Sequence, residues 1–179
     1  MKKIIVLLLT AIMSLSSCEK DDICDANTPT TPRLIIEFYD ISNPSVLKNV
    51  TNLKVIGEGM TEGIIFNPNS TDESQYLTNG NKIAIPLKTD GDTTSYNFIL
   101  NSGNPNPILT DTDKVTFNYS RADVFVSRAC GFKTLFKFNG NNAIEHTAVP
   151  ATRPKWMQYI SVEKSNIDNE NETHIKVFF

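Results

Sequence analysis

The chain has 179 residues and a formal net charge of −3 at pH 7, with 17 Lys and Arg against 20 Asp and Glu. The basic residues form no cluster, which argues against nucleic-acid binding, because that function needs concentrated Lys and Arg to displace phosphate counterions. We expect one folded domain, since a chain of this length rarely supports two separate cores.

The first 17 residues have the organisation of a bacterial export signal. Two lysines precede an apolar run over residues 4–13, and Leu15-Ser16-Ser17 then leads to Cys18. The apolar run is too short to span a bilayer. Leu-Ser-Ser-Cys resembles the lipobox of bacterial lipoproteins, in which the cysteine becomes the acylated first residue. We predict a signal peptide over 1–17 and lipidation, with two or three acyl chains, at Cys18; the alternative is an ordinary signal peptide with a chance cysteine.

Residues 18–32 are polar and are predicted to form a flexible stalk. Glu19-Lys20-Asp21-Asp22 resembles the sequence that follows the acylated cysteine in Bacteroidota lipoproteins exported to the outer leaflet of the outer membrane. Thr28-Pro29-Thr30-Thr31-Pro32 disfavours helix and favours extended chain. We predict an outer-membrane protein that faces the cell exterior. The alternative is a solvated tether that faces the periplasm.

Two of the three cysteines remain after lipidation, Cys24 and Cys130. Disulfides persist in the oxidising compartments to which such proteins are exported, so we predict that these two cysteines are bonded. Two free buried thiols, or a metal site shared with His146, are the alternatives. The chain lacks Cys-x-x-Cys and paired histidine spacings, which disfavours the metal site.

From Arg33 onward, apolar residues recur at every second position in short stretches bounded by Gly, Pro, Asn and Asp, a pattern typical of β-strands. Nine segments show this alternation: 34–39, 53–55, 83–87, 96–100, 115–119, 124–126, 132–138, 159–163 and 174–178. Each strand should place one apolar face in a core. We predict a single all-β domain over 33–179, a two-sheet antiparallel β-sandwich, immunoglobulin-like or similar; a closed barrel of about eight strands is the alternative.

The connections carry further expectations. Asp90-Gly91 predicts a hairpin between the strands at 83–87 and 96–100, and Pro86 belongs on an edge or at a bulge. Residues 139–141 and 166–172 are expected to be hairpin turns, and 145–154 the longest loop of the domain. Helix should be limited to short turns such as 44–48.

Three features together resemble a family of small flavobacterial lipoproteins of unknown function. These are the lipobox with its Thr/Pro-rich stalk, the segment Pro32-Arg33-Leu34-Ile35-Ile36-Glu37-Phe38-Tyr39-Asp40, and the later Cys130-Gly131-Phe132. The resemblance implies a lipid anchor and a β-fold over most of the mature chain. It implies no known activity and no catalytic residues.

Catalytic motifs are absent from the sequence: it has no Gly-x-Ser-x-Gly, no His-Glu-x-x-His and no Walker loop. The sequence has two histidines, His146, which follows Glu145, and His174. Acid-base catalysis would require them to meet in the fold together with a nucleophile. His174 lies at the start of a strand, where an exposed or capping imidazole is the simpler interpretation. Residues 168–172 offer carboxylates to Ca²⁺ but lack the spacing of a calcium loop, so a solvated hairpin tip is favoured. We predict no catalytic residue, no metal site and no cofactor.

Trp156, the only tryptophan, and Tyr159 are the candidate binding residues. Such side chains stack on sugar rings or anchor protein partners, although core packing is the more common role of a tryptophan. Asp92-Thr93-Thr94 weakly resembles the sequence that Bacteroidota O-glycosylate.

The predicted function is that of a surface lipoprotein, held in the membrane by its N-terminal lipid, that acts as a binding or assembly module for an outer-membrane protein or a glycan. The alternative is a hydrolase on a β scaffold that acts on glycans or peptides. A cleft lined by Glu145, His146 and another carboxylate would favour the hydrolase, and an exposed aromatic patch near Trp156 would favour binding.

Overall fold

The computed structural model describes residues 23–28 and 30–179. The predicted signal peptide and Cys18 lie outside the described residues. The described chain divides into two compact units. We call residues 31–123 with 134–179 the sandwich unit, and residues 23–28 and 30 with 124–133 the hairpin unit.

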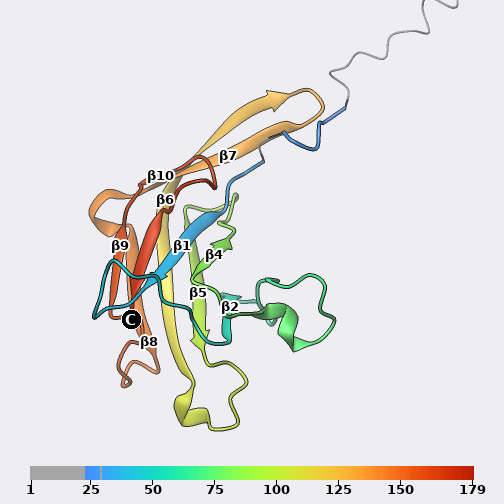
Figure 1. The fold of residues 1–179 in the computed structure, drawn as a ribbon. Helices are drawn as coiled ribbons and strands as arrows, with labels where there is room; N and C mark the ends of the chain where they lie inside the picture. The colour runs from blue at the N-terminus through green and yellow to red at the C-terminus, as the bar shows by residue number, and fades with distance from the viewer. Residues whose placement is uncertain (1–22, 29) are drawn as a thin grey trace, which may run out of the picture. The chain divides into compact units, whose positions relative to one another are not determined.

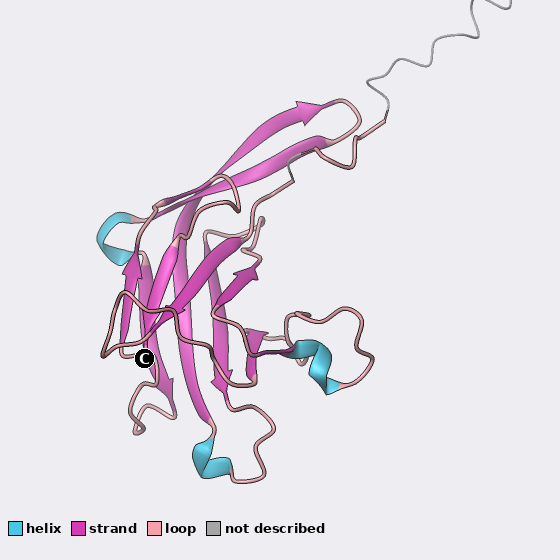
Figure 2. Cartoon of the chain, viewed as in Figure 1, coloured by secondary structure: helices cyan, strands magenta, loops and turns pink. Residues whose placement is uncertain are grey.

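Strands account for nearly all of the regular structure (Figure 2). The helical elements within the described ranges are three short 3₁₀ turns: η2 (Glu73–Tyr76), η3 (Pro107–Leu109) and η4 (Gly140–Asn142). None of the described helices is long and apolar enough to cross a membrane.

The first sheet has four strands in the order β4-β1-β11-β9 (Figure 1). They are β4 (Lys82–Ile85), β1 (Leu34–Tyr39), β11 (Ile175–Phe178) and β9 (Tyr159–Val162). β1 and β11 are parallel, and the other neighbours are antiparallel. β4 is an edge strand and ends immediately before Pro86, which has no amide hydrogen to continue the ladder. The expectation that Pro86 lies at an edge is therefore confirmed.

The second sheet has seven strands, with the path β10-β7-β6-β5-β2-β3 and with β8 paired to β6. Its strands are β2 (Leu53–Gly57), β3 (Leu77–Thr78), β5 (Thr93–Leu100), β6 (Asp111–Ser127), β7 (Gly131–Phe138), β8 (Ile144–Val149) and β10 (Asn166–Ile167). β6 ends in the hairpin unit and β7 begins there, while the remaining part of each strand belongs to the sandwich unit.

The core of the sandwich unit is built from the apolar faces of both sheets. Alternate residues of the strands are buried, among them Leu34, Ile36, Phe38, Ile83, Ile85, Phe98, Val115, Phe117, Tyr119, Phe136, Ile175 and Val177. The alternation arises because successive side chains of a strand point to opposite faces of a sheet. The predicted two-sheet sandwich is confirmed, and the sheets do not close into the alternative barrel.

The hairpin predicted at Asp90-Gly91 is wrong. β4 pairs with β1, whereas β5 pairs with β2 and β6 in the other sheet. The Asp-Gly pair therefore lies in a connection between the two layers. The turn residues specify a reversal of the chain, but they do not specify whether the following strand pairs laterally or crosses to face its predecessor.

Two other expectations about elements are corrected. Residues 115–119 and 124–126 belong to one continuous strand, β6. The segment expected to be the longest loop, 145–154, contains most of β8, which pairs with β6. β8 escaped detection because His146 and Ala148 occupy its inward positions and give a weak apolar signal.

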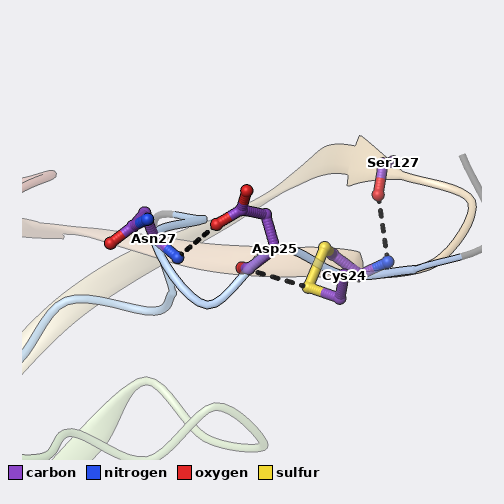
Figure 3. Close-up of a disulfide and its surroundings, with 5 residues drawn as sticks. Cys24, Asp25, Asn27 and Ser127 are labelled. Carbon is purple, nitrogen blue, oxygen red and sulfur yellow. Dashed lines mark hydrogen bonds between the residues drawn. A yellow bond between two sulfur atoms is a disulfide. The ribbon is translucent and has the colours of Figure 1, made fainter. Parts of the chain in front are cut away.

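The predicted disulfide between Cys24 and Cys130 is confirmed; it lies in the hairpin unit and joins residues 106 positions apart (Figure 3). Asp25 forms a turn next to it, since its Oδ1 accepts a hydrogen bond of 2.8 Å from the backbone N–H of Asn27. On the other side of the bond, the backbone N–H of Cys130, in the turn between β6 and β7, donates to Ser127 Oγ at 3.0 Å. The disulfide therefore holds residues of the predicted stalk against the turn between β6 and β7.

Candidate functional site

The outer face of the four-stranded sheet carries a row of three aromatic side chains, Tyr39, Phe178 and Tyr159, which we call the aromatic ladder. Tyr39 is in register with Phe178 on the parallel strand β11, and Phe178 is in register with Tyr159 on β9. The ring centroids are 5.5 Å apart for Tyr39–Phe178 and 5.7 Å apart for Phe178–Tyr159. Tyr159 is 58% exposed, and the other two rings are partly exposed.

The alternation of the strands explains why these rings face outward. Phe38 and Val177, the sequence neighbours of the ladder on β1 and β11, are buried in the core between the sheets. Since consecutive side chains of a strand point to opposite faces, Tyr39 and Phe178 must lie on the outer face. The ladder is therefore an apolar surface that the two-layer core leaves uncovered.

Charged and polar side chains form the next row of the same face. Lys82 Nζ lies 3.3 Å from Glu37 Oε1, and Tyr39 Oη donates a hydrogen bond of 2.9 Å to Glu37 Oε2. Lys176 Nζ lies 3.2 Å from Glu163 Oε2 and 5.3 Å from the centroid of the Tyr39 ring. The aromatic ladder is thus bordered by a network of two carboxylates and two ammonium groups.

The carboxylates of this network are ionised at neutral pH. Partial burial raises the pKa of Glu37, but hydrogen bonds from Tyr39, Thr173 and Lys82 outweigh it, so the net shift lowers that pKa. Hydrogen bonds from Ser161 and Lys176 lower the pKa of Glu163. Both groups are therefore available as hydrogen-bond acceptors.

Such a face suits a ligand that presents both apolar and hydroxyl-bearing surfaces. Aromatic rings offer a large contact area with few rotamers to lose, and their π faces attract C–H edges and cations. Ionised carboxylates and ammonium groups supply charge-assisted hydrogen bonds to polar groups beside those rings. A sugar ring has this combination, and so does a polar protein surface.

Of the two candidate binding residues, Tyr159 belongs to the ladder and Trp156 does not. Trp156 is buried, its indole N–H donates to the carbonyl oxygen of Phe98 at 3.1 Å, and its ring packs edge-on against Phe179. Trp156 is therefore part of the core. The sequence did not single out Tyr39 and Phe178 for binding, because the parallel pairing that aligns them joins segments from opposite ends of the domain.

The structure pairs His146 with a carboxylate that the sequence analysis did not consider. His146 Nε2 lies 2.8 Å from Oδ2 of Asp113, which is fully buried and also accepts a 2.9 Å hydrogen bond from the backbone N–H of Met157. Among the described residues, no hydroxyl or thiol group is hydrogen-bonded to His146. Glu145 is exposed and accepts from Asn118 instead. The pair therefore fastens β8 and the chain at Met157 to β6.

His174 is buried, at 1% exposure, where the sequence favoured an exposed or capping imidazole. Its Nδ1 accepts a hydrogen bond of 3.0 Å from the backbone N–H of Ile35, so the neutral ring carries its proton on Nε2, a buried atom without a partner in the structure. Burial lowers the pKa of His174, against the opposing effect of Asp168, Glu172 and Glu170. No hydrogen bond joins His174 to His146, which lies on the other sheet.

The acidic segment 168–172 is engaged by cations of the chain itself. Glu170 accepts hydrogen bonds from the Arg33 backbone N–H, Nε and Nη2, and Glu172 pairs with Lys164 at 3.2 Å. Two open hollows of about 310 and 320 Å³ lie beside this segment and share Asn166 and Asp168. Within the described residues, no three ligating side chains are grouped to hold a metal ion.

Thr93, the weak glycosylation candidate, begins β5 and is exposed. Its hydroxyl donates to Asn118 Oδ1 at 3.0 Å.

The chain belongs to a family of unknown function, DUF6452, whose pattern matches residues 52–179. No curated protein and no solved structure matches the chain.

Proposed function

We propose that the chain is an outer-membrane lipoprotein of the flavobacterial type, anchored through acylated Cys18 and facing the cell exterior, whose sandwich unit binds a glycan on the aromatic ladder. The observation that carries the binding role is the exposed row of Tyr39, Phe178 and Tyr159 beside ionised Glu37 and Glu163.

The lipobox, the acidic residues after Cys18 and the disulfide support the anchor and the location. Disulfides persist outside the cytosol, so the Cys24–Cys130 bond fits an exported protein. Two or three acyl chains on Cys18 give stable attachment, since one chain binds a membrane only marginally.

The anchor is tested by metabolic labelling with a fatty-acid analogue. The wild-type protein should be labelled, and Cys18→Ala should not; equal labelling of both would refute lipidation at Cys18. Protease added to intact cells should remove the domain. If digestion requires a permeabilised outer membrane, the protein faces the periplasm.

Binding is tested by affinity gel electrophoresis of the folded protein with soluble β-glucan, xylan, mannan and starch. We expect the polysaccharide to retard migration of the wild-type protein. The single variants Tyr159→Ala and Phe178→Ala should each bind about tenfold more weakly, which corresponds to the loss of one stacking contact of about 1.4 kcal/mol. Ile65→Ala, which truncates an exposed apolar residue away from the ladder, is the matched control and should bind like the wild type. If Tyr159→Ala instead abolishes capture of an outer-membrane protein, the ladder is a protein-docking surface.

A hydrolase remains the second candidate function because of the Asp113–His146 pair. Release of reducing ends from the same polysaccharides, abolished in His146→Gln, would establish it. Retarded migration with no products would leave binding as the function.

A further inference from the structure

The hairpin unit exposes apolar side chains that no second layer of the described residues covers. Phe125 is 58% exposed, Phe132 68% and Ile23 76%, and Val124 is also exposed. The Phe125 and Phe132 rings contact each other edge to face, with centroids 5.4 Å apart. All of these residues lie within the hairpin unit, so the apolar surface is a property of that unit alone.

The predicted acylation site is tied closely to this surface. Cys18 and Cys24 are six peptide steps apart, and an extended chain of that length spans at most about 20 Å. Cys24 in turn is bonded to Cys130, with their Cα atoms 5.0 Å apart. Acyl chains on Cys18 would therefore keep the turn between β6 and β7 within about 25 Å of the bilayer surface, the reach of the extended chain plus the span of the disulfide.

The charges of the β6–β7 turn also favour contact with a bilayer. Residues 124–133 contain Arg128 and Lys133 and no acidic residue, and the other described segment of the hairpin unit contains one acidic residue, Asp25, so basic residues outnumber acidic ones by two to one. Basic residues that flank exposed aromatic and aliphatic side chains are typical of segments that bind the interface of an anionic membrane.

We propose that the hairpin unit is a second membrane contact, in which Phe125, Phe132 and Ile23 enter the interface of the bilayer that holds the Cys18 acyl chains. A second copy of the chain is a weaker candidate, since stable protein interfaces bury at least about 1,000 Å² and the hairpin unit comprises only two short segments. A lipid interface requires no such complementary area. This inference rests on the lipidation proposed above.

The test uses the full acylated protein reconstituted in vesicles of phosphatidylethanolamine and phosphatidylglycerol that contain a lipid brominated in its acyl chains. Bromine quenches nearby tryptophan emission, and the wild type, whose Trp156 is buried in the sandwich unit, supplies the background. The added emission of Phe132→Trp should fall by about half or more, because side chains bound at an interface lie ~5–10 Å into the headgroup and acyl boundary. Ile65→Trp, an exposed position of the sandwich unit outside the aromatic ladder, is the matched control and should be little quenched.

A second measurement follows transfer of the acylated protein between vesicles. Phe125→Ser combined with Phe132→Ser should accelerate transfer by about two orders of magnitude, since two exposed rings leave the interface. Ile108→Ser combined with Leu109→Ser removes two exposed apolar side chains from η3 and should leave the rate unchanged.

The outcomes separate this inference from the proposed anchor. A wild type that partitions with vesicles through Cys18 but shows no quenching at Phe132→Trp overturns the membrane contact and leaves the anchor intact. A wild type that does not partition overturns both. Concentration-dependent dimers that the double serine substitution abolishes, without quenching, would assign the surface to a second copy.

Discussion

The sandwich unit and the hairpin unit hold apolar side chains in opposite ways. In the sandwich unit two sheets face each other, and residues such as Phe38 and Phe117 are buried between them. In the hairpin unit no second layer within the described part of the chain covers the ends of β6 and β7, so Phe125 and Phe132 are exposed and a disulfide supplies the constraint. Phenylalanine therefore stabilises the sandwich unit, where an opposing sheet covers it, and forms an exposed apolar surface on the hairpin unit, where no such layer is described.

The largest expected effect comes from the core. Phe38→Ala should lower the free energy of unfolding by about 3–5 kcal/mol, because it removes a buried ring and leaves a cavity. Tyr39→Ala, one residue later on the outer face, should cost about 1 kcal/mol. Urea denaturation followed by the fluorescence of Trp156 measures both, since this single tryptophan reports on the sandwich unit. Equal losses would mean that the two faces of β1 are not distinct.

The second effect concerns the disulfide. Cys24→Ser combined with Cys130→Ser should lower the free energy of unfolding by about 2–4 kcal/mol, because the bond restricts the unfolded chain across 106 positions. Hydrogen exchange should accelerate over 23–30 and 124–133, while the core strands stay protected. Loss of protection in β5 or β11 would show that the bond is required for the sandwich to fold.

A smaller effect is expected in the aromatic ladder. Phe178→Ala removes the central ring and two cross-strand contacts, and should cost about 1 kcal/mol in the same urea experiment. Phe132→Ala is the comparison in the hairpin unit and should change stability by less than about 0.5 kcal/mol. A larger loss for Phe132→Ala would show that this ring has a covering partner.

The remaining effect is a pH dependence of stability that arises from His174. Since burial lowers its pKa, the unfolded chain binds a proton that the folded chain does not, once the pH falls below the ordinary histidine pKa of about 6.5. Stability should therefore decrease from pH 7 to pH 5, with a slope of at most about 1.4 kcal/mol per pH unit for one proton.

The charged groups that act on His174 are Asp168, Glu170, Glu172 and Lys82. His174→Asn keeps an acceptor for the Ile35 N–H and removes the titration, so its stability should vary less with pH over this range. An unchanged slope in His174→Asn would assign the pH dependence to other groups.

The sequence predicts the strands better than it predicts their partners. Most strands were recognisable because their own residues alternate, as in β1 and β5. Pairing depends on distant segments, and so the Asp90-Gly91 hairpin was wrong and the parallel β1–β11 pair was not expected. Phe132 lies at an even-numbered position of its strand, as Phe136 and Phe138 do, so the alternation predicts that all three face the core. Phe132 is nevertheless exposed, because the alternation does not show where the opposing sheet ends.

The candidate site was predictable only in part. Tyr159 was identified from its residue type, but its two ladder neighbours depend on strand register. Asp113 is a charged residue in an inward position of β6, and its partners, His146 and the Met157 backbone, lie in later segments of the chain. Residue type therefore identifies candidate site residues, and the pairing of the strands determines which of them lie close together.

The parallel pairing of β1 with β11 also governs the order in which the sandwich unit can be completed. Ile36 aligns with Ile175, 139 positions later, and β11 lies between β1 and β9. A chain that leaves the ribosome or a translocation channel from its N-terminus can form the β5–β6 ladder and the β1–β4 pair early, but the other edge of β1 must wait for β11, when almost the whole domain has been delivered. Such distant contacts slow folding and prolong the exposure of apolar strands. With the export proposed above, the chain would enter the periplasm with an incomplete four-stranded sheet, which a periplasmic chaperone would have to protect until β11 arrives.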